Sequence, residues 1–276
     1  MELSFLLGSG VDLHSYEPSV KDISAIKNAD VVIFVGGESD EWVEFALSAP
    51  EKSSKGSEKS GPKVVNLLEI LGEHAKAEEV KEGMQADHDE HFAVEEQSEL
   101  DEHVWLSVKN AKIFCEAICD ALCELEELNS DVYKKNLLSY TEKLDSLDKR
   151  FEETVSKGNK KTLLFGDRFP FRYLTDDYNL DYYAAFAGCS AETEASFETV
   201  IFLSKKITEL NLNSVLKIEG GDGKIAKTIV QNCKKPNVKV LTLDSMQSVT
   251  NADAKNGASY ISIMEKNLSV LATALE

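Results

Sequence analysis

Apolar residues follow two kinds of pattern along the chain. Short runs rich in Val, Ile, Leu and aromatic residues are typical of buried strands. They lie at 31–35, 64–68, 162–165, 182–186, 215–218 and 238–243. Segments with helical periodicity lie at 20–28, 38–47, 108–125, 197–210, 224–233 and 258–275. Strands that alternate with helices predict an α/β protein whose mainly parallel sheets are covered by helices.

One segment carries a longer helical pattern than the others. Ser130 is a candidate N-cap, apolar residues then recur in steps of three and four, and Gly158 is a helix stop. A helix over 130–157 would be roughly 40 Å long at 1.5 Å per residue. It predicts a linker between an N-terminal lobe at 1–129 and a C-terminal lobe at 158–276. A ligand is then expected in the cleft between them, beyond the carboxyl ends of the strands.

The acidic segment 73–102 interrupts this alternation. It has the period of neither a strand nor a helix, and we expect a long mobile loop. Its histidines are His74, His88 and His91. Imidazole and carboxylate groups together suit zinc and related divalent ions, so the segment is a candidate for auxiliary metal capture. A solvated acidic loop with incidental histidines is the alternative interpretation.

The composition narrows the range of possible binding partners. The 276 residues are 42% hydrophobic and carry a net charge of −19. This charge argues against nucleic acid and anionic membranes, and it leaves cations, small molecules or proteins as partners of an expected monomer. No run of about 18 apolar residues predicts a spanning helix, and the first residues lack the features of a signal peptide. The odd number of cysteines, five, does not suit a disulfide framework.

Two histidines are placed where they could ligate a metal. His14 follows the apolar run 3–7, expected as a strand, and could otherwise cap the helix after it. His103 ends the acidic segment and opens a helix, and its alternative role is a hinge residue anchored beside Trp105.

Two aspartates follow predicted strands. Asp167 is a candidate ligand or ligand-orienting group, and otherwise an ion-pair partner of Arg168. Asp244 is a candidate ligand too, with a helix N-cap as its alternative role.

Motifs of catalysis are missing from the sequence. It contains no Walker A loop, nucleophile elbow, His-Glu-x-x-His or Cys-x-x-Cys. We therefore expect a binding protein and no enzyme, because an α/β hydrolase that used Asp167 and Asp244 would need a nucleophile or an activated water. Cys115, Cys119 and Cys123 share one helix face and are interpreted as small core residues.

Several segments together resemble a known family. Residues 10–18, Gly-Val-Asp-Leu-His-Ser-Tyr-Glu-Pro, look like a Gly-x-Asp-x-His-x-Tyr-x-Pro segment. Residues 28–42 look like the strand and turn that follow, and 101–107 and 243–245 are similar to further segments. Over nearly its whole length the chain resembles the zinc/manganese ABC-transporter solute-binding proteins.

This resemblance implies two lobes joined by one long helix, with a metal between them. Its ligands would be His14 and His103 from the first lobe and Asp244 from the second. The remaining His or Glu of the family falls on Arg168, which has no lone pair for a metal. Asp167 is therefore taken as the substitute, with water as the alternative. The implied metal is zinc, with manganese as the alternative.

The resemblance also implies partners and a location. The partners are an ABC permease and its ATPase, and the location is extracytoplasmic, either periplasmic or held by a lipid anchor. A metal-binding surface adhesin and a paralogue without tight metal binding are the alternatives, the latter suggested by Arg168. The signal sequence, strand and helix with which the family begins have no counterpart here, so we expect an incomplete first sheet.

Overall fold

The computed structural model describes residues 2–7, 11, 13–48, 61–85, 99–190 and 194–276. Its first sheet pairs β1 (Val31–Phe34) with β2 (Lys63–Asn66) in parallel. Helices α1 (Val20–Asn28) and α2 (Glu41–Ser48) pack beside it. Ile26, Val32, Phe34, Val43 and Ala46 form their small shared core. The segment 2–7 is not a strand, which corrects our expectation for the apolar run 3–7.

The second sheet is larger and entirely parallel, with strand order β4-β3-β5-β6. The strands are β3 (Thr162–Arg168), β4 (Asp181–Phe186), β5 (Ser214–Lys217) and β6 (Lys239–Thr242). Successive side chains of β3 point to opposite faces of this sheet. Leu164 packs against α7 (Phe197–Glu209) and α8 (Lys224–Asn232) in one core cluster. Leu163 and Phe165 belong to the other cluster, with α5 (Ser130–Lys157) and α10 (Tyr260–Ala274).

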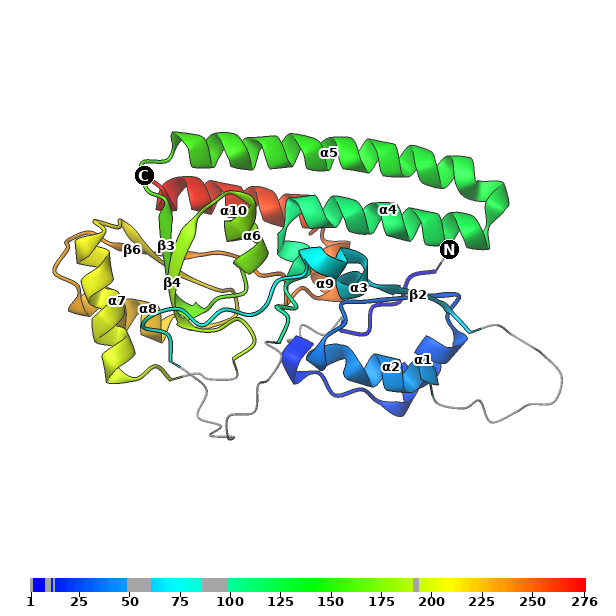
Figure 1. Ribbon diagram of the computed structural model, residues 1–276, viewed down its shortest axis with the longest axis horizontal. Helices are drawn as coiled ribbons and strands as arrows, with labels where there is room; N and C mark the ends of the chain where they lie inside the picture. The colour runs from blue at the N-terminus through cyan, green and yellow to red at the C-terminus, as the bar shows by residue number, and fades with distance from the viewer. Residues whose placement is uncertain (1, 8–10, 12, 49–60, 86–98, 191–193) are drawn as a thin grey trace.

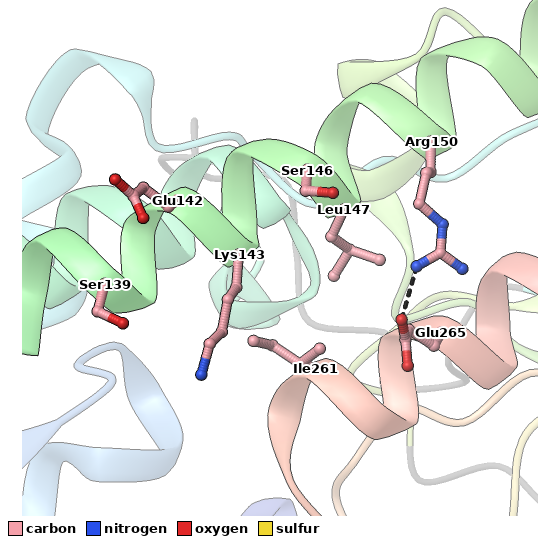
Figure 2. A pocket seen from close by; sticks show the side chains of 8 residues that line it. All are labelled: Ser139, Glu142, Lys143, Ser146, Leu147, Arg150, Ile261 and Glu265. Carbon is pink, nitrogen blue, oxygen red and sulfur yellow. Dashed lines mark hydrogen bonds and ion pairs between the residues drawn. The ribbon is translucent and has the colours of Figure 1, made fainter.

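Helix α5 (Ser130–Lys157) runs along the molecule and contacts both α4 (Val108–Leu125) and α10 (Tyr260–Ala274) (Figure 1). Its bounds confirm the helix predicted from the spacing of apolar residues. A hollow of about 440 Å³ lies between α5 and α10, and Arg150 pairs with Glu265 there at 2.6 Å (Figure 2). The described residues include no helix long and apolar enough to cross a membrane.

Shorter elements complete the fold. They are α3 (Leu67–Leu71), α6 (Arg172–Asp177), α9 (Asn251–Lys255) and five 3-10 turns at Leu13–Ser15, Glu38–Asp40, Gly72–His74, Val104–Leu106 and Glu127–Asn129. Cys119 is buried, and Cys115 packs against the largest core cluster, in agreement with the interpretation of these thiols as core residues.

The described part of the acidic segment is held by specific contacts, in contrast to the mobile loop that we expect from the sequence. Glu79 pairs with Arg172 at 2.7 Å and accepts a hydrogen bond from the Tyr182 hydroxyl at 2.8 Å. The backbone N–H of Gln85 donates to the Ala185 carbonyl at 3.0 Å. Residues 76–85 therefore connect the first half of the chain to the second sheet.

Candidate metal centre

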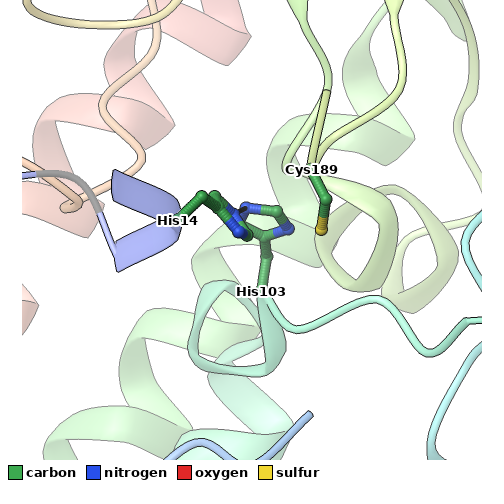
Figure 3. A group of neighbouring side chains, drawn as sticks. All are labelled: His14, His103 and Cys189. Atoms are coloured by element: carbon green, nitrogen blue, oxygen red, sulfur yellow. Dashed lines mark hydrogen bonds between the residues drawn. The ribbon is translucent and has the colours of Figure 1, made fainter. Parts of the chain in front are cut away.

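The two candidate histidines meet although 89 positions separate them. Their Nε2 atoms lie 3.2 Å apart, and their ring centroids 5.2 Å. His14 lies on the 3-10 turn Leu13–Ser15, and His103 caps the turn Val104–Leu106. Figure 3 shows the two imidazole rings side by side, on separate segments of the chain.

A buried carboxylate orients His103. Asp101 Oδ1 lies 3.0 Å from His103 Nδ1 and also accepts the backbone N–H of His103 at 2.8 Å. His103 is 0% exposed and Asp101 2%, so water does not compete for these contacts. A proton on Nδ1 satisfies the carboxylate and leaves a lone pair on Nε2, which is the arrangement of a metal-ligating histidine.

His14 is held in a similar way. Its Nδ1 lies 2.8 Å from Ser39 Oγ and 3.6 Å from Glu102 Oε2. Glu102 Oε1 accepts the backbone N–H of Ser39 at 2.9 Å, while its buried Oε2 has no hydrogen-bond partner among the described residues. Gly37, at φ 81°, leaves the space that this carboxylate occupies. The negative charge of Glu102 favours a proton on the Nδ1 of His14, so its Nε2 also carries a lone pair.

Cys189 is the third member of the cluster. One ligand atom from each of His14, His103 and Cys189 lies within 4.8 Å of the other two (Figure 3). No other group of three or more such side chains is found among the described residues. Cys189 follows β4, so it reaches the two histidines from the second sheet. Our sequence analysis missed it, although a polar side chain after a buried strand was the criterion that selected Asp167 and Asp244.

Acidic groups surround this cluster. Burial raises the pKa of the Cys189 thiol, and the nearby carboxylates of Glu78, Asp101 and Glu102 raise it further. A thiolate there would be unfavourable in the absence of a cation, because it would add negative charge to a buried acidic region. The surroundings therefore favour a positively charged occupant.

Asp167 lies outside this group. Its Oδ1 accepts the backbone N–H of Arg168 at 2.9 Å and its Oδ2 that of Ile218 at 3.2 Å. Burial raises its pKa, although these two hydrogen bonds act in the opposite direction. Asp167 and Arg168 border a cavity of about 620 Å³, which Glu219 and Gln247 also line.

Asp244 is likewise outside the group. Its Oδ1 accepts the backbone N–H of Met246 at 2.8 Å, and its own N–H donates to Asn267 Oδ1 at 2.8 Å. Burial raises its pKa. These hydrogen bonds of Asp244 stabilise the turn after β6. That Asp244 and Asp167 ligate the metal stays a prediction.

The loop after β6 nevertheless reaches the histidines. Gln247 Nε2 lies 3.1 Å from His103 Nε2, and Gln247 Oε1 accepts a hydrogen bond from Ser245 Oγ at 3.0 Å. The Trp105 indole N–H donates to the Ser245 carbonyl at 2.9 Å and fixes this loop against the Val104–Leu106 turn. The second sheet therefore closes the centre from two sides, through the segments of Cys189 and Gln247.

The predicted auxiliary histidines are not part of this centre as far as the structure describes them. His74 is exposed on the turn Gly72–His74 and belongs to no cluster of ligand atoms among the described residues. His88 and His91 lie outside the described residues.

The fold consists of two parallel sheets flanked by helices and spanned by one long helix. An imidazole pair and a thiol lie between the sheets, so the fold and the site define a binding protein with a candidate metal centre. The family model described as the periplasmic component A of a zinc-uptake complex matches residues 1–274, and the chain belongs to this family. The resemblance seen in the sequence is therefore confirmed, as is the predicted fold class.

Individual relatives agree with this assignment. The chain is 31% identical over 271 residues to the zinc-binding lipoprotein AdcA of Streptococcus pneumoniae, covering 98% of this chain and 50% of AdcA. It is 27% identical to the high-affinity zinc uptake system protein ZnuA of Bacillus subtilis, covering 99% of this chain and 81% of ZnuA. The Zn(II)-bound ZnuA-like domain of S. pneumoniae AdcA superposes with a TM-score of 0.71 at 27% identity, covering 98% of this chain and 89% of that domain. The chain thus spans about half the length of the AdcA proteins that it matches.

Proposed function

We propose that this chain captures zinc between its two sheets and delivers it to an ABC-type uptake transporter. The observation that carries the proposal is the pair of Nε2 atoms 3.2 Å apart, each on a ring whose Nδ1 faces an oxygen. Two Zn–N bonds of about 2.0–2.1 Å at a tetrahedral angle place their nitrogens about 3.3–3.4 Å apart. The two imidazoles are therefore nearly preorganised for one shared ion.

The charge of the molecule supports a cationic cargo. The net charge of −19 attracts cations, and Asp101 and Glu102 place buried negative charge directly behind the two rings. Neutral imidazoles suit zinc, whereas calcium and magnesium prefer shells of oxygen ligands. Manganese is the alternative cargo that the experiment below compares with zinc.

Further ligands are proposed from the second sheet. Asp167 and Asp244 are the carboxylates that our sequence analysis assigned to this role. Neither carboxylate belongs to the group of ligand atoms formed by His14, His103 and Cys189, so their participation would require a movement of the turns after β3 and β6 when zinc binds.

The transport role rests on the family and its named relatives, and the permease and the ATPase are part of the proposal. We place the protein outside the cytoplasm, as a non-enzymatic component that works as a monomer. Its lobes would be 1–129 and 158–276, with α5 as the connection between them. The acidic segment with His74, His88 and His91 would be an auxiliary capture region.

Calorimetric titration of chelator-stripped protein with Zn²⁺ and Mn²⁺ tests the proposal. We expect one tight zinc site that is lost in His14→Ala and His103→Ala. His74→Ala is the matched variant, because it removes an exposed imidazole outside the cluster and should leave the tight site intact. A folded wild type without a tight zinc site would contradict the proposal and favour a paralogue that has lost metal binding.

A further inference from the structure

We infer that Cys189 is a metal ligand, so that the centre combines two imidazoles with one thiolate. This inference rests on the proposed function, since it names a donor for the same metal. It also adds a sulfur donor from the second half of the chain, where our sequence analysis named only the carboxylates of Asp167 and Asp244 as ligands. The cargo it selects is a borderline or soft cation, with Zn²⁺ favoured over Mn²⁺.

The first argument is geometric. The three ligand atoms lie within 4.8 Å of one another, and they come from three segments that are far apart in the sequence. A tetrahedral zinc with Zn–S of about 2.3 Å and Zn–N of about 2.0–2.1 Å needs nitrogen and sulfur about 3.6 Å apart. A change in side-chain torsion and a small movement of the loop would bring the thiol to this distance.

The second argument is that the backbone holds Cys189 at this place. Its N–H donates to Glu78 Oε1 at 2.8 Å. A Cβ on the preceding Gly188 would lie 3.1 Å from His103 Cε1 and 2.9 Å from the Phe169 carbonyl oxygen. Only a residue without a side chain allows the backbone so close to the imidazole, so the Gly-Cys pair presents the thiol beside His103.

The third argument comes from the other cysteines. Cys115 and Cys233 pack against hydrophobic core clusters, as a structural cysteine does. Cys189, like Cys119 and Cys123, belongs to none of the hydrophobic clusters found among the described residues, and it differs from both in its polar surroundings. Its neighbours are two imidazoles and the carboxylates of Glu78, Asp101 and Glu102. A partly buried thiol in such a setting is better explained by coordination than by packing.

The chemistry of the step is simple and involves no redox change. The S–H bond of Cys189 breaks, a sulfur–metal bond forms, and the proton leaves to solvent. The metal keeps its charge, and the thiolate reduces the net charge of the centre by one. Because the histidines lie on the first-sheet side and Cys189 follows β4, the bound ion joins the two sheets.

Cobalt(II) absorption spectroscopy of the reduced protein tests the inference. We expect wild type to show a thiolate-to-cobalt charge-transfer band that Cys189→Ser loses while the weaker d–d bands remain. Cys233→Ser is the matched control and should keep the band. The zinc affinity of Cys189→Ser should fall by more than the ~10–100-fold that loss of an outer-shell partner costs.

The outcomes separate the two proposals. Absence of tight metal binding in folded wild type would overturn the proposed function. Tight binding without the charge-transfer band, or with a band that persists in Cys189→Ser, would overturn the sulfur ligand alone. If Cys189→Ser does not fold, alkylation of wild type mapped by mass spectrometry replaces it. Zinc should then protect Cys189 and leave Cys233 as reactive as before, and equal reactivity of Cys189 with and without zinc would contradict the inference.

Discussion

Asp101 and His103 form a buried pair in which one carboxylate oxygen lies 3.0 Å from Nδ1 of the ring and 2.8 Å from the backbone N–H of the same residue. Because a single oxygen fixes both the ring and its backbone, the direction of Nε2 depends on Asp101.

Replacement of this carboxylate should weaken metal binding with little change in the fold. In Asp101→Asn the amide oxygen can still accept a hydrogen bond, but the charge that favours the Nδ1–H tautomer is lost. We expect a ~10–100-fold lower zinc affinity, measured by competition with a chelating indicator. Asp145→Asn, at an exposed carboxylate paired with Lys112, should leave the affinity unchanged. Equal affinities of Asp101→Asn and wild type would show that the carboxylate does not position the ring.

A side chain at position 188 should disturb the same ring from the opposite side. In Gly188→Ala the new methyl group would lie 2.9 Å from a backbone oxygen and 3.1 Å from the His103 ring. Overpacking of this kind costs about 1–3 kcal/mol, which corresponds to about 5- to 150-fold in affinity if the bound state bears the strain. Gly221→Ala is the control, since its nearest contact is Asp167 Oδ2 at 3.7 Å. Calorimetry should show weaker zinc binding only in the first variant.

Asp177 should make the stability of the protein depend on pH. Burial raises its pKa to about 6 from 3.8, against the effect of its hydrogen bond from Ser107 Oγ. Between these values the folded state holds a proton that the unfolded state has released. The contribution of Asp177 to stability is therefore complete below about pH 4 and is lost as the pH rises through about 6.

The variant Asp177→Asn should remove this dependence. Relative to wild type it should gain up to about 3 kcal/mol of unfolding free energy between pH 4 and pH 7.5, at 1.36 kcal/mol per pKa unit. Urea denaturation at the two pH values measures the difference. A constant offset between variant and wild type across this range would show that the carboxyl group is not perturbed.

Substitutions in the long helix α5 should lower the stability of the protein only on its buried face. Phe151 is 0% exposed and stacks on Tyr178 with ring centroids 5.2 Å apart. We expect Phe151→Ala to cost about 3–5 kcal/mol in urea denaturation, because it removes buried area and leaves a cavity. Leu138→Ala, on the same helix but 62% exposed, should change stability by less than about 0.5 kcal/mol. Similar losses in both variants would contradict the one-sided burial of α5.

The regular elements could be predicted because their periods are local properties of the sequence. Each of the six strands has a counterpart in the structure, and the bounds of α5 follow from its apolar spacing and from Gly158. Helices α3, α6 and α9 were missed because one or two turns carry too little periodicity. The run 3–7 has the composition of a strand but forms none, and Phe5 is 60% exposed there.

The candidate metal centre was harder to predict from the sequence because it depends on contacts between residues that are far apart along the chain. His14 and His103 stood out through their motifs, and the structure brings them together. Cys189 did not, since its neighbours along the chain give no sign of the two imidazoles. The packing of the acidic segment was also hidden, because it relies on the pairing of Glu79 with Arg172, 93 positions away.

That packing has a mechanical consequence. Gln85 donates its backbone N–H to the Ala185 carbonyl and accepts the backbone N–H of Ser196, so residues 76–85 hold the chain that follows the first sheet against the second sheet, at a place well away from α5 in Figure 1. The two halves of the molecule are therefore connected both by α5 and by the contacts of residues 76–85. A hinge motion that separates the two sheets would first have to break the contacts of residues 76–85. Under the proposed function, release of the metal would then rely on local movements of the segments that carry its ligands, the short turn with His14 among them, and not on an opening of the two sheets.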